Sequence, residues 1–369
     1  MIKILVAGQT PPPFHGQAVM IQEMLNGSYD RVKLYPVRMS FSREIDDIGT
    51  FQVRKILHLF LVIAKIIFYK FKYRIQILYY PPAGPDKIPI MRDLIILSCT
   101  RWLFKHVIFH FHAAGVSTMY EKMSLFWKLL YKKFYFSPDI AIRLSEYNPD
   151  DSHFMQAQKE FIVPNGVTDY QEHFVQTTEQ KQSPFQILYV GVITRTKGIM
   201  VLVEACRILK EKNLDFNVNI VGGFDSELFR QRVEARIHKS NLGDNFTFHG
   251  VLIENDKNRQ YDQADLFCYP TYYESETFSI VLLEAMQFFT PVVTTRWRGV
   301  QSVVREGENG FLVPIKDSVA LAEKIELMMK NPDLRLKMAQ RGRQIFLQEY
   351  TIQTFQKNME KVFLSLDHP

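Results

Sequence analysis

The sequence contains few cysteines, and this scarcity excludes two kinds of site. Only Cys99, Cys206 and Cys268 occur in the 369 residues. The number is odd and no CxxC pair is present, which argues against a disulfide framework or a cysteine metal site and for a reducing compartment. Each cysteine stands in an apolar run, so we expect all three to be buried.

The sequence also lacks a long apolar run and a dinucleotide fingerprint. Its longest apolar stretch, Ile56 to Phe68, is interrupted by His58 and Lys65, and a membrane span needs about 20 apolar residues. The first residues read as a buried strand that ends at Gly8, not as a signal segment. No G-x-G-x-x-G motif follows this strand, which argues against an NAD-dependent dehydrogenase. We therefore expect a cytoplasmic protein.

Basic residues are concentrated in one part of the chain, whose total formal net charge is +6. Between Val53 and Lys133 there are 14 lysines and arginines against three acids, a local net charge of +11. Aromatic residues fill the same stretch, namely Phe60, Phe68, Tyr69, Phe71, Tyr73, Trp102, Phe104, Phe126 and Trp127. This pattern leaves two interpretations open: a peripheral contact with the anionic inner face of a membrane, or an ordinary solvated basic surface. No nucleic-acid-binding motif accompanies the charge, so no nucleic-acid partner is expected.

Short β-rich runs alternate with helical stretches twice along the chain. We expect five strands in each half, at 3–7, 75–80, 105–110, 140–143 and 161–163, and at 186–190, 216–221, 246–249, 266–269 and 292–294. Helical stretches such as Arg54–Phe71 and Ser279–Phe288 lie between them. Strands that alternate with helices predict an α/β fold with one parallel sheet in each half.

A change in composition predicts where the halves meet. Residues 171–184 are rich in Gln, Glu and Thr without an apolar period, so we expect a linker there. It would separate an N-terminal Rossmann-like domain, 1–170, from a C-terminal one, 185–350. Residues 351–369 carry an apolar stripe typical of a helix, which we expect to pack back toward the first domain. Two such domains would face a central cleft, with ligands beyond the carboxyl ends of the strands.

Two acids eight residues apart, Glu276 and Glu284, form the most specific motif. Glu276 falls in the loop after the predicted strand 266–269, and Glu284 falls on the helix that follows. Phe278 and Ser279 open that helix, so its free backbone amides can face an anion. Burial of the Glu284 carboxylate without a partner would be costly. This arrangement favours a sugar nucleotide, with amides for the diphosphate and carboxylates for the hydroxyls.

The E-x7-E spacing, followed by Ala285-Met286, resembles the signature of the retaining family-4 (group 1) glycosyltransferases, which have the GT-B fold. Further segments resemble the family in the same order, namely Pro11-Pro12-Pro13 with Gly16, Val163–Val167, Leu188–Gly191, Lys197-Gly198, Val221–Gly223, Phe248–Gly250, Ala264–Leu266 and Glu306–Val313. The resemblance covers nearly the whole second half and is looser in the first.

The resemblance implies a hexosyltransferase that retains the anomeric configuration. Its donor would be a UDP- or GDP-sugar, and it would need no divalent metal and no other cofactor. The implied acceptor is a saccharide, and the basic, aromatic first half suggests that this saccharide is lipid-linked, as in surface polysaccharide or glycolipid synthesis.

The resemblance also implies roles for single residues. Glu284 is expected to hold the ribose hydroxyls, and Glu276, with the backbone from Thr277 to Ser279, the transferred sugar and the diphosphate. Lys197 is expected to neutralise the departing phosphate.

One position departs from the family pattern. Val192 stands where an arginine usually follows the glycine of the strand. Arg195 lies three residues further on, and because an arginine side chain is long and forks onto phosphate, we expect it to supply the second cation.

Three histidines of the first half are candidate site residues. His110 and His112 would point to the same side of a strand, but no third ligand with suitable spacing accompanies them, so a metal pair is not expected. By resemblance, His112 lies near the donor sugar, whereas His110 is satisfied in the core. His15 is a further candidate beside Gly16, which lets the backbone approach the diphosphate.

Two other functions stay open. A GT-B type UDP-sugar 2-epimerase closes similar domains on a nucleotide sugar, although without this E-x7-E context. A non-catalytic partner subunit that binds a nucleotide sugar would be consistent with Val192 in place of the arginine. Fold alone does not decide between them.

Overall fold

The computed structural model describes residues 1–12, 15–41, 53–174 and 184–366. The chain forms two compact units, one made of Met1–Gly166 with Ile352–Pro369 and the other of Val167–Thr351. The first unit therefore ends at Gly166, before the boundary at residue 170 that the composition suggests. Val167 is already tied to the second unit, because its amide donates to the carbonyl of Tyr350, 2.9 Å away. Most of the predicted linker 171–184, and Pro13 of the proline loop, lie outside the described residues.

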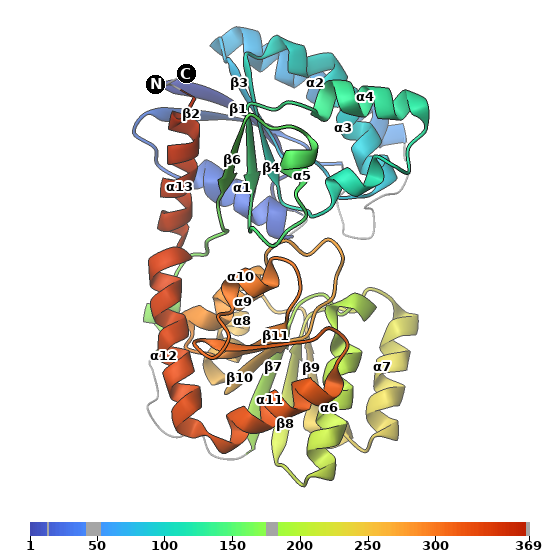
Figure 1. The fold of residues 1–369 in the computed structure, drawn as a ribbon, viewed down its shortest axis with the longest axis vertical. Coiled ribbons are helices and arrows are strands. Elements are labelled where there is room, and N and C mark those ends of the chain that lie inside the picture. The colour runs from blue at the N-terminus through green and yellow to red at the C-terminus, as the bar shows by residue number, and fades with distance from the viewer. Residues whose placement is uncertain (13–14, 42–52, 175–183, 367–369) are drawn as a thin grey trace. The chain divides into compact units, whose positions relative to one another are not determined.

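The first unit contains one six-stranded parallel sheet in the order β2-β1-β3-β4-β5-β6 (Figure 1). Its strands are β1 (Ile2–Gly8), β2 (Val32–Arg38), β3 (Ile77–Tyr80), β4 (His106–Phe111), β5 (Ile140–Arg143) and β6 (Lys159–Ile162). Its helices are α1 (Gly16–Asn26), α2 (Val53–Tyr73), α3 (Lys87–Thr100), α4 (Leu125–Tyr135), α5 (Asp151–Phe154) and α13 (Ile352–Leu364), with short 3-10 turns η2 (Arg101–Leu103) and η3 (Val116–Met119).

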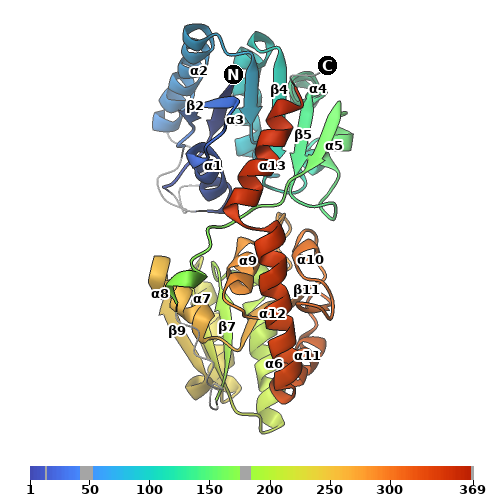
Figure 2. The ribbon, with the colours of Figure 1, turned by 90° about the vertical axis from the view of Figure 1, so that its left-hand side faces the viewer.

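The two faces of this sheet bury different helices. Leu5 and Leu78 belong to one core cluster with Val62 and Ile66 of α2 and Leu94 of α3. The opposite face carries α1 and α13, which contact each other (Figure 2). Because successive strand residues alternate between faces, a parallel sheet covered on both sides needs strands that are mostly apolar, and β1 and β3 in its interior have this composition.

Helix α13 returns to the first unit, as expected from its apolar stripe. The ring of Phe363 meets Tyr29 edge-on at 6.2 Å and Tyr79 at 6.4 Å between ring centroids. The side-chain amide of Gln356, near the end of the sequence, donates at 2.9 Å to the carbonyl of Glu23, near its beginning.

The second unit contains another six-stranded parallel sheet, in the order β12-β11-β10-β7-β8-β9. Its strands are β7 (Phe185–Val190), β8 (Phe216–Val221), β9 (Phe246–Gly250), β10 (Leu266–Tyr269), β11 (Val292–Thr295) and β12 (Gly310–Val313). Its helices are α6 (Ile199–Glu211), α7 (Glu227–Lys239), α8 (Glu254–Gln263), α9 (Ile280–Gln287), α10 (Val300–Val303), α11 (Ser318–Lys330) and α12 (Pro332–Glu349), with 3-10 turns η4 (Gln171–His173), η5 (Arg195–Lys197) and η6 (Gly243–Asn245).

The order of the second sheet reverses between two neighbouring strands. Strands β7, β8 and β9 are added toward one edge, and β10, β11 and β12 toward the other. The reversal lies between β7 and β10, where Leu266 pairs with Ile187 and Phe267 with Leu188. In open parallel sheets the loops at such a reversal diverge to opposite faces, leaving a crevice at the carboxyl ends of the strands.

The prediction of five strands in each half was wrong by one strand in each. The strands missed, β2 and β12, are both edge strands. Strand β2 contains Pro36, which cannot donate to the ladder and is tolerated at a sheet edge. Strand β12 has only four residues and starts with Gly310. Cys99 is another correction, because it is exposed on α3 rather than buried.

The long helix α2 does not change the expectation about membrane spans. No helix among the residues that the structure describes is both long enough and apolar enough to cross a bilayer.

Replacing the Phe363 side chain should loosen α13 from the first unit. We expect Phe363→Ala to lower the free energy of unfolding by about 3–5 kcal/mol, because the cavity would lie in a fully packed aromatic cluster. Thermal unfolding measures the change, with Lys361→Ala, exposed on the same helix, as the control. Equal melting temperatures for the two variants would contradict the packing described.

Candidate functional site

The loops at the reversal of the second sheet hold an ion pair. Lys197 ends η5 after β7, and Glu276 lies in the loop between β10 and α9. The Lys197 ammonium nitrogen lies 2.5 Å from Oε2 of Glu276, and the hydroxyl of Thr271 donates to the same oxygen at 3.3 Å. Glu276 is buried, with 8% of its surface exposed. The structure thus brings together two residues predicted from separate motifs.

Tyrosine rings surround the Lys197 ammonium group. It lies over the ring of Tyr273, 4.7 Å from the centroid, and 5.5 Å from that of Tyr269. Both contacts fall within the range of cation–π attraction. Burial, together with the Glu276 carboxylate, raises the pKa of Tyr269 well above its usual range, so this phenol stays neutral. Lys197 is therefore held by one carboxylate and two aromatic rings.

Gly198 allows the loop of Lys197 to approach the end of β10. Its φ of +86° is in the left-handed region, and a Cβ at this position would lie 2.0 Å from the carbonyl oxygen of Pro270. Any other residue would push the two loops apart. The glycine of the Lys197-Gly198 pair therefore sets the distance between Lys197 and the strand before Glu276.

The start of α9 adds hydrogen-bond donors next to this pair. Ser279 is the N-cap residue, and its buried hydroxyl makes no hydrogen bond within the described part of the chain. Thr277 and Phe278 are buried as well. The amides of the first helical turn have no partner within the helix, and a buried hydroxyl needs one. An oxygen-rich anion fits both requirements.

Glu284 lies one turn into α9 and is held by α8. Its two carboxylate oxygens contact the Lys257 ammonium nitrogen at 2.6 Å and the hydroxyl of Tyr261 at 2.8 Å. The sequence predicted the need for a partner but did not identify these two residues. Lys257 and Tyr261 are four residues apart in the sequence, so they share one face of α8. That spacing was the signal that could have found them.

The structure does not join Arg195 to the ion pair. Its side chain is exposed and pairs with no carboxylate of the described residues, while its carbonyl accepts a hydrogen bond of 2.7 Å from the hydroxyl of Tyr272. Val192 is also exposed. Arg195 thus lies on the same loop as Lys197, but it is exposed and makes no contact with the ion pair.

In the first unit, His15, Gly16 and His112 lie at the carboxyl ends of strands. His15 caps α1 by accepting a hydrogen bond from the Ala18 amide at 3.4 Å, and Gly16 is the first residue of that helix. His112 follows β4 directly. Burial, and then the nearby His15, lower the pKa of His112 to about 3. His112 is therefore neutral at physiological pH.

His110 lies in the core, but only one of its two ring nitrogens has a hydrogen-bond partner among the described residues. It is fully buried, and its Nδ1 lies 2.7 Å from the hydroxyl of Tyr79. Its ring lies against that of His112, with centroids 4.0 Å apart and the ring planes tilted by 34°. The two histidines do point to one side of the strand, and His110 supports the ring of His112. Among the residues that the structure places, no group of three or more His, Cys, Asp or Glu side chains is arranged to hold a metal ion.

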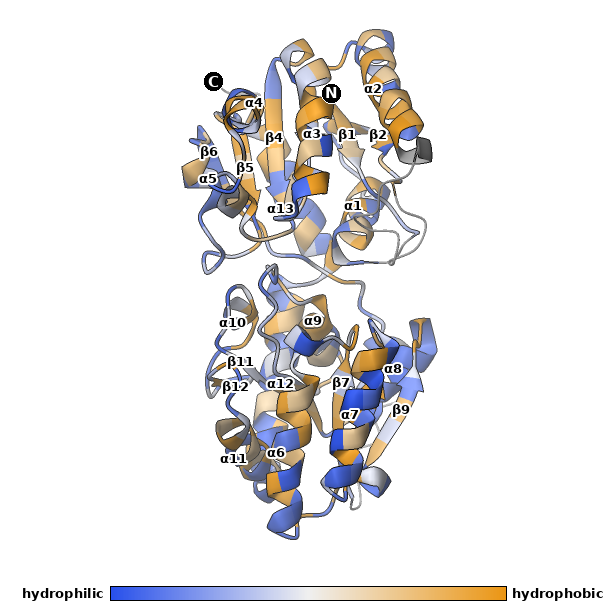
Figure 3. Cartoon of the chain, turned by 90° about the vertical axis from the view of Figure 1, so that its right-hand side faces the viewer, coloured by the Kyte–Doolittle hydropathy of each residue, from blue (hydrophilic) through white to orange (hydrophobic). Residues whose placement is uncertain are grey.

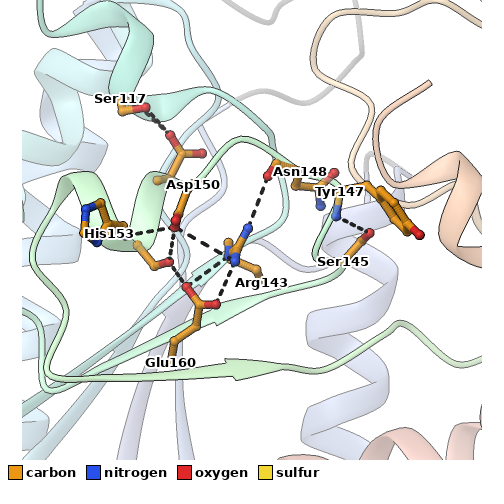
Figure 4. A network of polar contacts seen from close by, with 10 residues as sticks. Ser117, Arg143, Ser145, Tyr147, Asn148, Asp150, His153 and Glu160 are labelled. Atoms are coloured by element: carbon orange, nitrogen blue, oxygen red, sulfur yellow. Dashed lines mark hydrogen bonds and ion pairs between the residues drawn. The ribbon is translucent and has the colours of Figure 1, made fainter.

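A polar network that the sequence did not suggest fixes the loop after β5 (Figure 4). Arg143 ends β5 and donates to both carboxylate oxygens of Glu160 on β6, at 2.7 and 3.0 Å. It also donates to the carbonyl of Asn148, 3.1 Å away. The Ser145 hydroxyl accepts from the amide of Tyr147 at 3.1 Å. The network therefore holds residues 145–150 in a defined shape at the carboxyl edge of the first sheet.

Asp151 fixes the loop that follows His112 through hydrogen bonds. Its carboxylate accepts hydrogen bonds from the amides of Gly115 and Ser117 at 2.9 and 2.8 Å, and from the Ser117 hydroxyl at 2.5 Å. Burial raises the pKa of Asp151, although these donors act in the opposite direction. Two neighbouring loops at the carboxyl edge are thereby fastened together.

Comparison with known proteins supports the predicted family. Residues 170–345 match the family model described as glycosyl transferases group 1. This match covers most of the second unit and confirms the predicted resemblance to the group 1 glycosyltransferases.

A curated relative matches over a similar region. The capsular polysaccharide biosynthesis glycosyltransferase CapM of Staphylococcus aureus is 29% identical over 181 residues, which cover 48% of this chain and 46% of that protein. The chain thus spans about half the length of the curated relatives it matches.

Solved structures are similar over the whole chain. A sucrose-phosphate synthase from Thermosynechococcus elongatus has a TM-score of 0.74 at 19% identity, covering 100% of this chain and 99% of its own. HepE of Anabaena, solved in complex with UDP-glucose, has a TM-score of 0.71 at 17% identity, covering 99% of this chain and 100% of its own. At these identities the likeness shows the fold, and it confirms the predicted GT-B fold of two Rossmann-like domains.

The low pKa of His112 predicts a pH-dependent stability of the first unit. Its folded pKa of about 3 lies below the value of 6.5 expected when unfolded, so the unfolded chain binds a proton that the folded unit excludes. Stability from this residue is complete above pH 6.5 and is lost as the pH falls toward 3. Between pH 6.5 and about 5.5 the loss amounts to about 1 kcal/mol.

Thermal unfolding of His112→Gln across this pH range tests the shift. The variant should lose less stability on acidification than the parent protein. The exposed His153, changed to Gln, provides the control. Parallel pH profiles for the parent and His112→Gln would show that His112 titrates normally in the folded unit.

Proposed function

We propose that the chain is a retaining, metal-independent glycosyltransferase. It transfers a hexose-type sugar from a nucleotide-diphosphate sugar to a saccharide acceptor in polysaccharide or glycolipid synthesis. The observation that carries the proposal is the Lys197–Glu276 ion pair at the strand-order reversal, next to the start of α9. The match of residues 170–345 to the group 1 family model supports it.

The second unit offers a binding site for the donor diphosphate. Lys197 supplies a positive charge, and the α9 amides with the Ser279 hydroxyl supply neutral donors. When the bond between the anomeric carbon and the phosphate oxygen breaks, negative charge grows on the leaving diphosphate and oxocarbenium character on the sugar. Donors fixed in advance stabilise that charge without reorganising. The cations of the chain itself perform here the role that a divalent ion has in other transferases.

Lys197 and Glu276 contact different parts of the donor: Lys197 the diphosphate, and Glu276 the transferred sugar. The Lys197 ammonium group can contact a diphosphate oxygen and the Glu276 carboxylate at the same time, since its nitrogen lies only 2.5 Å from Oε2 of Glu276. The carboxylate accepts hydrogen bonds from hydroxyls of the transferred sugar, and Thr271 keeps it oriented. Arg195 becomes the second cation when its exposed side chain turns toward the phosphate. The function of Arg195 therefore requires a movement, whereas that of Lys197 does not.

Glu284 suits the ribose of the donor. Lys257 and Tyr261 fix its carboxylate plane, so the remaining lone pairs can accept from two neighbouring hydroxyls. In a helix that is otherwise apolar, this carboxylate is oriented before the donor arrives.

The first unit contributes Gly16 and His112 to the proposed reaction. A neutral His112 forms a hydrogen bond with a sugar hydroxyl and adds no positive charge beside an oxocarbenium-like centre. Because Gly16 has no side chain, the backbone of its loop can approach the diphosphate closely. The ordered loop 145–150 offers a surface for the acceptor, which we propose to be a lipid-linked saccharide.

Removal of either partner of the ion pair should lower turnover strongly. We expect Lys197→Met and Glu276→Gln each to reduce kcat by about 10²–10³, with Lys197→Met affecting kcat more than donor affinity. Glu274→Gln is the matched control, because Glu274 is an exposed acid two residues before Glu276. Sugar transfer measured with purified variants decides, and near-normal turnover in Lys197→Met would exclude this site.

A donor panel tests the substrate class. We expect one of the UDP-, GDP- and ADP-sugars, at about 100 times its dissociation constant, to raise the stability of the protein by about 2.7 kcal/mol. Glu284→Ala should weaken that effect. Stabilisation by none of them would contradict a nucleotide-sugar site.

The product distinguishes the alternatives. NMR of the glycosidic product should show the anomeric configuration of the donor sugar. Epimerisation of UDP-GlcNAc at C2 without any acceptor would instead indicate an epimerase.

A further inference from the structure

Three helices of the first unit expose apolar outer faces. On α2 the exposed side chains include Leu57, Phe60, Leu61, Phe68 and Phe71. The opposite face of the same helix is buried against the sheet, through residues such as Val62 and Ile66. In the view of Figure 3, the side of α2 that faces the viewer is mostly hydrophobic. A surface helix that is apolar on both sides normally has a partner on its outer face.

The neighbouring helices continue this surface. Helix α3 packs against both α2 and α4. Ile88, Ile95 and Trp102 are exposed and seven residues apart, so they share one face of α3 and η2. On α4, the exposed Phe126 and Leu129 share a face with Lys133. The outer layer of these helices is therefore an apolar surface, and we name it the α2–α4 surface.

A cationic cavity lies at the end of this surface. It is a shallow, open cavity of about 400 Å³ and is lined by Arg101, Trp102, Lys105 and Lys133, among others. Trp102 is 73% exposed and stands at its rim. Lys105 and Lys133 form no ion pair with any carboxylate of the described residues, and the one acid in the wall, Asp139, lies 2.7 Å from Nδ1 of His106 and faces three cations of the lining. The cavity therefore carries excess positive charge.

This cavity is separate from the candidate site in the same unit. It lies where β4 and β5 begin, next to Lys105 and Asp139. His112 follows the other end of β4. An anion bound here would not touch the residues proposed to act in sugar transfer.

We propose that the α2–α4 surface docks on an anionic lipid bilayer, and that the cavity at Arg101, Lys105 and Lys133 receives the phosphate of a lipid headgroup. The apolar side chains enter the boundary between headgroups and acyl chains, and Trp102 occupies the interfacial level that its amphipathic ring favours.

Charge complementarity favours a bilayer over a protein partner. From Val53 to Lys133 the sequence has a net charge of +11. Of its three acids, Asp93 is buried and bonded to Arg92, Glu121 is paired with Lys128, and Asp86 is exposed at the start of α3. A surface that combines exposed aromatic residues with unopposed lysines matches an anionic interface, where each basic residue near the surface contributes about 1 kcal/mol.

Vesicle sedimentation of the full-length protein tests this proposal without using sugar transfer. At about 0.1 M salt, where the screening length is about 10 Å, the protein should sediment with vesicles of phosphatidylcholine and phosphatidylglycerol but not with phosphatidylcholine alone. Lys105→Gln/Lys133→Gln should lower the partition coefficient about fivefold for each charge removed. Leu129→Ser should also weaken binding.

Matched controls carry the same changes on the second unit. Lys239→Gln/Lys337→Gln removes two exposed lysines, and Leu336→Ser removes a leucine that is about as exposed as Leu129. Both controls should bind vesicles like the parent protein. Equal weakening by the controls, or equal binding to neutral vesicles, would overturn the proposal.

Two further outcomes would overturn it in favour of another occupant. Stabilisation of the protein by inorganic phosphate, without sedimentation on anionic vesicles, would indicate a site for a free anion. A dimer in solution that Leu129→Ser dissociates, again without vesicle binding, would indicate that a second copy covers the surface.

Discussion

The ion pair between Lys197 and Glu276 depends on the order of the strands in the second sheet. Strands β7 and β10 are neighbours because the chain reverses its direction of growth between them. Their following loops therefore start side by side, although Lys197 and Glu276 are 79 residues apart in sequence. Helix α9 begins in the second of these loops and directs its free amides to the same place. One topological feature thus unites a cation, a carboxylate and a helix start.

Close approach of the two loops requires Gly198 and keeps the ion pair largely away from water. The position tolerates no Cβ, because Pro270 occupies that space. Tyrosine rings cover the ammonium group, and the carboxylate is buried. Charges in such surroundings are screened weakly. The proposed function depends on this environment, since an electrostatic contribution to catalysis is larger where water is excluded.

The first unit combines ordered loops at one end of its sheet with an apolar outer helix layer. Arg143 and Asp151 fasten the loops after β5 and β4, and α13 returns from the end of the chain to cover the opposite face. The sheet needs only one face of α2 for its core. The other face does not contribute to folding, which is why its composition points to a contact outside the fold.

The sequence alone determined the α/β class, the two-unit plan and the motif residues Lys197, Glu276 and Glu284, because apolar periodicity and local spacing depend on neighbouring residues. It missed β2, whose run is interrupted by Pro36, and β12, which has only four residues and starts with Gly310. It could not pair Glu276 with Lys197 or Glu284 with Lys257, and it placed Arg195 beside them although that side chain is exposed. Contacts between distant segments follow from strand order, and only the tertiary structure decides that order.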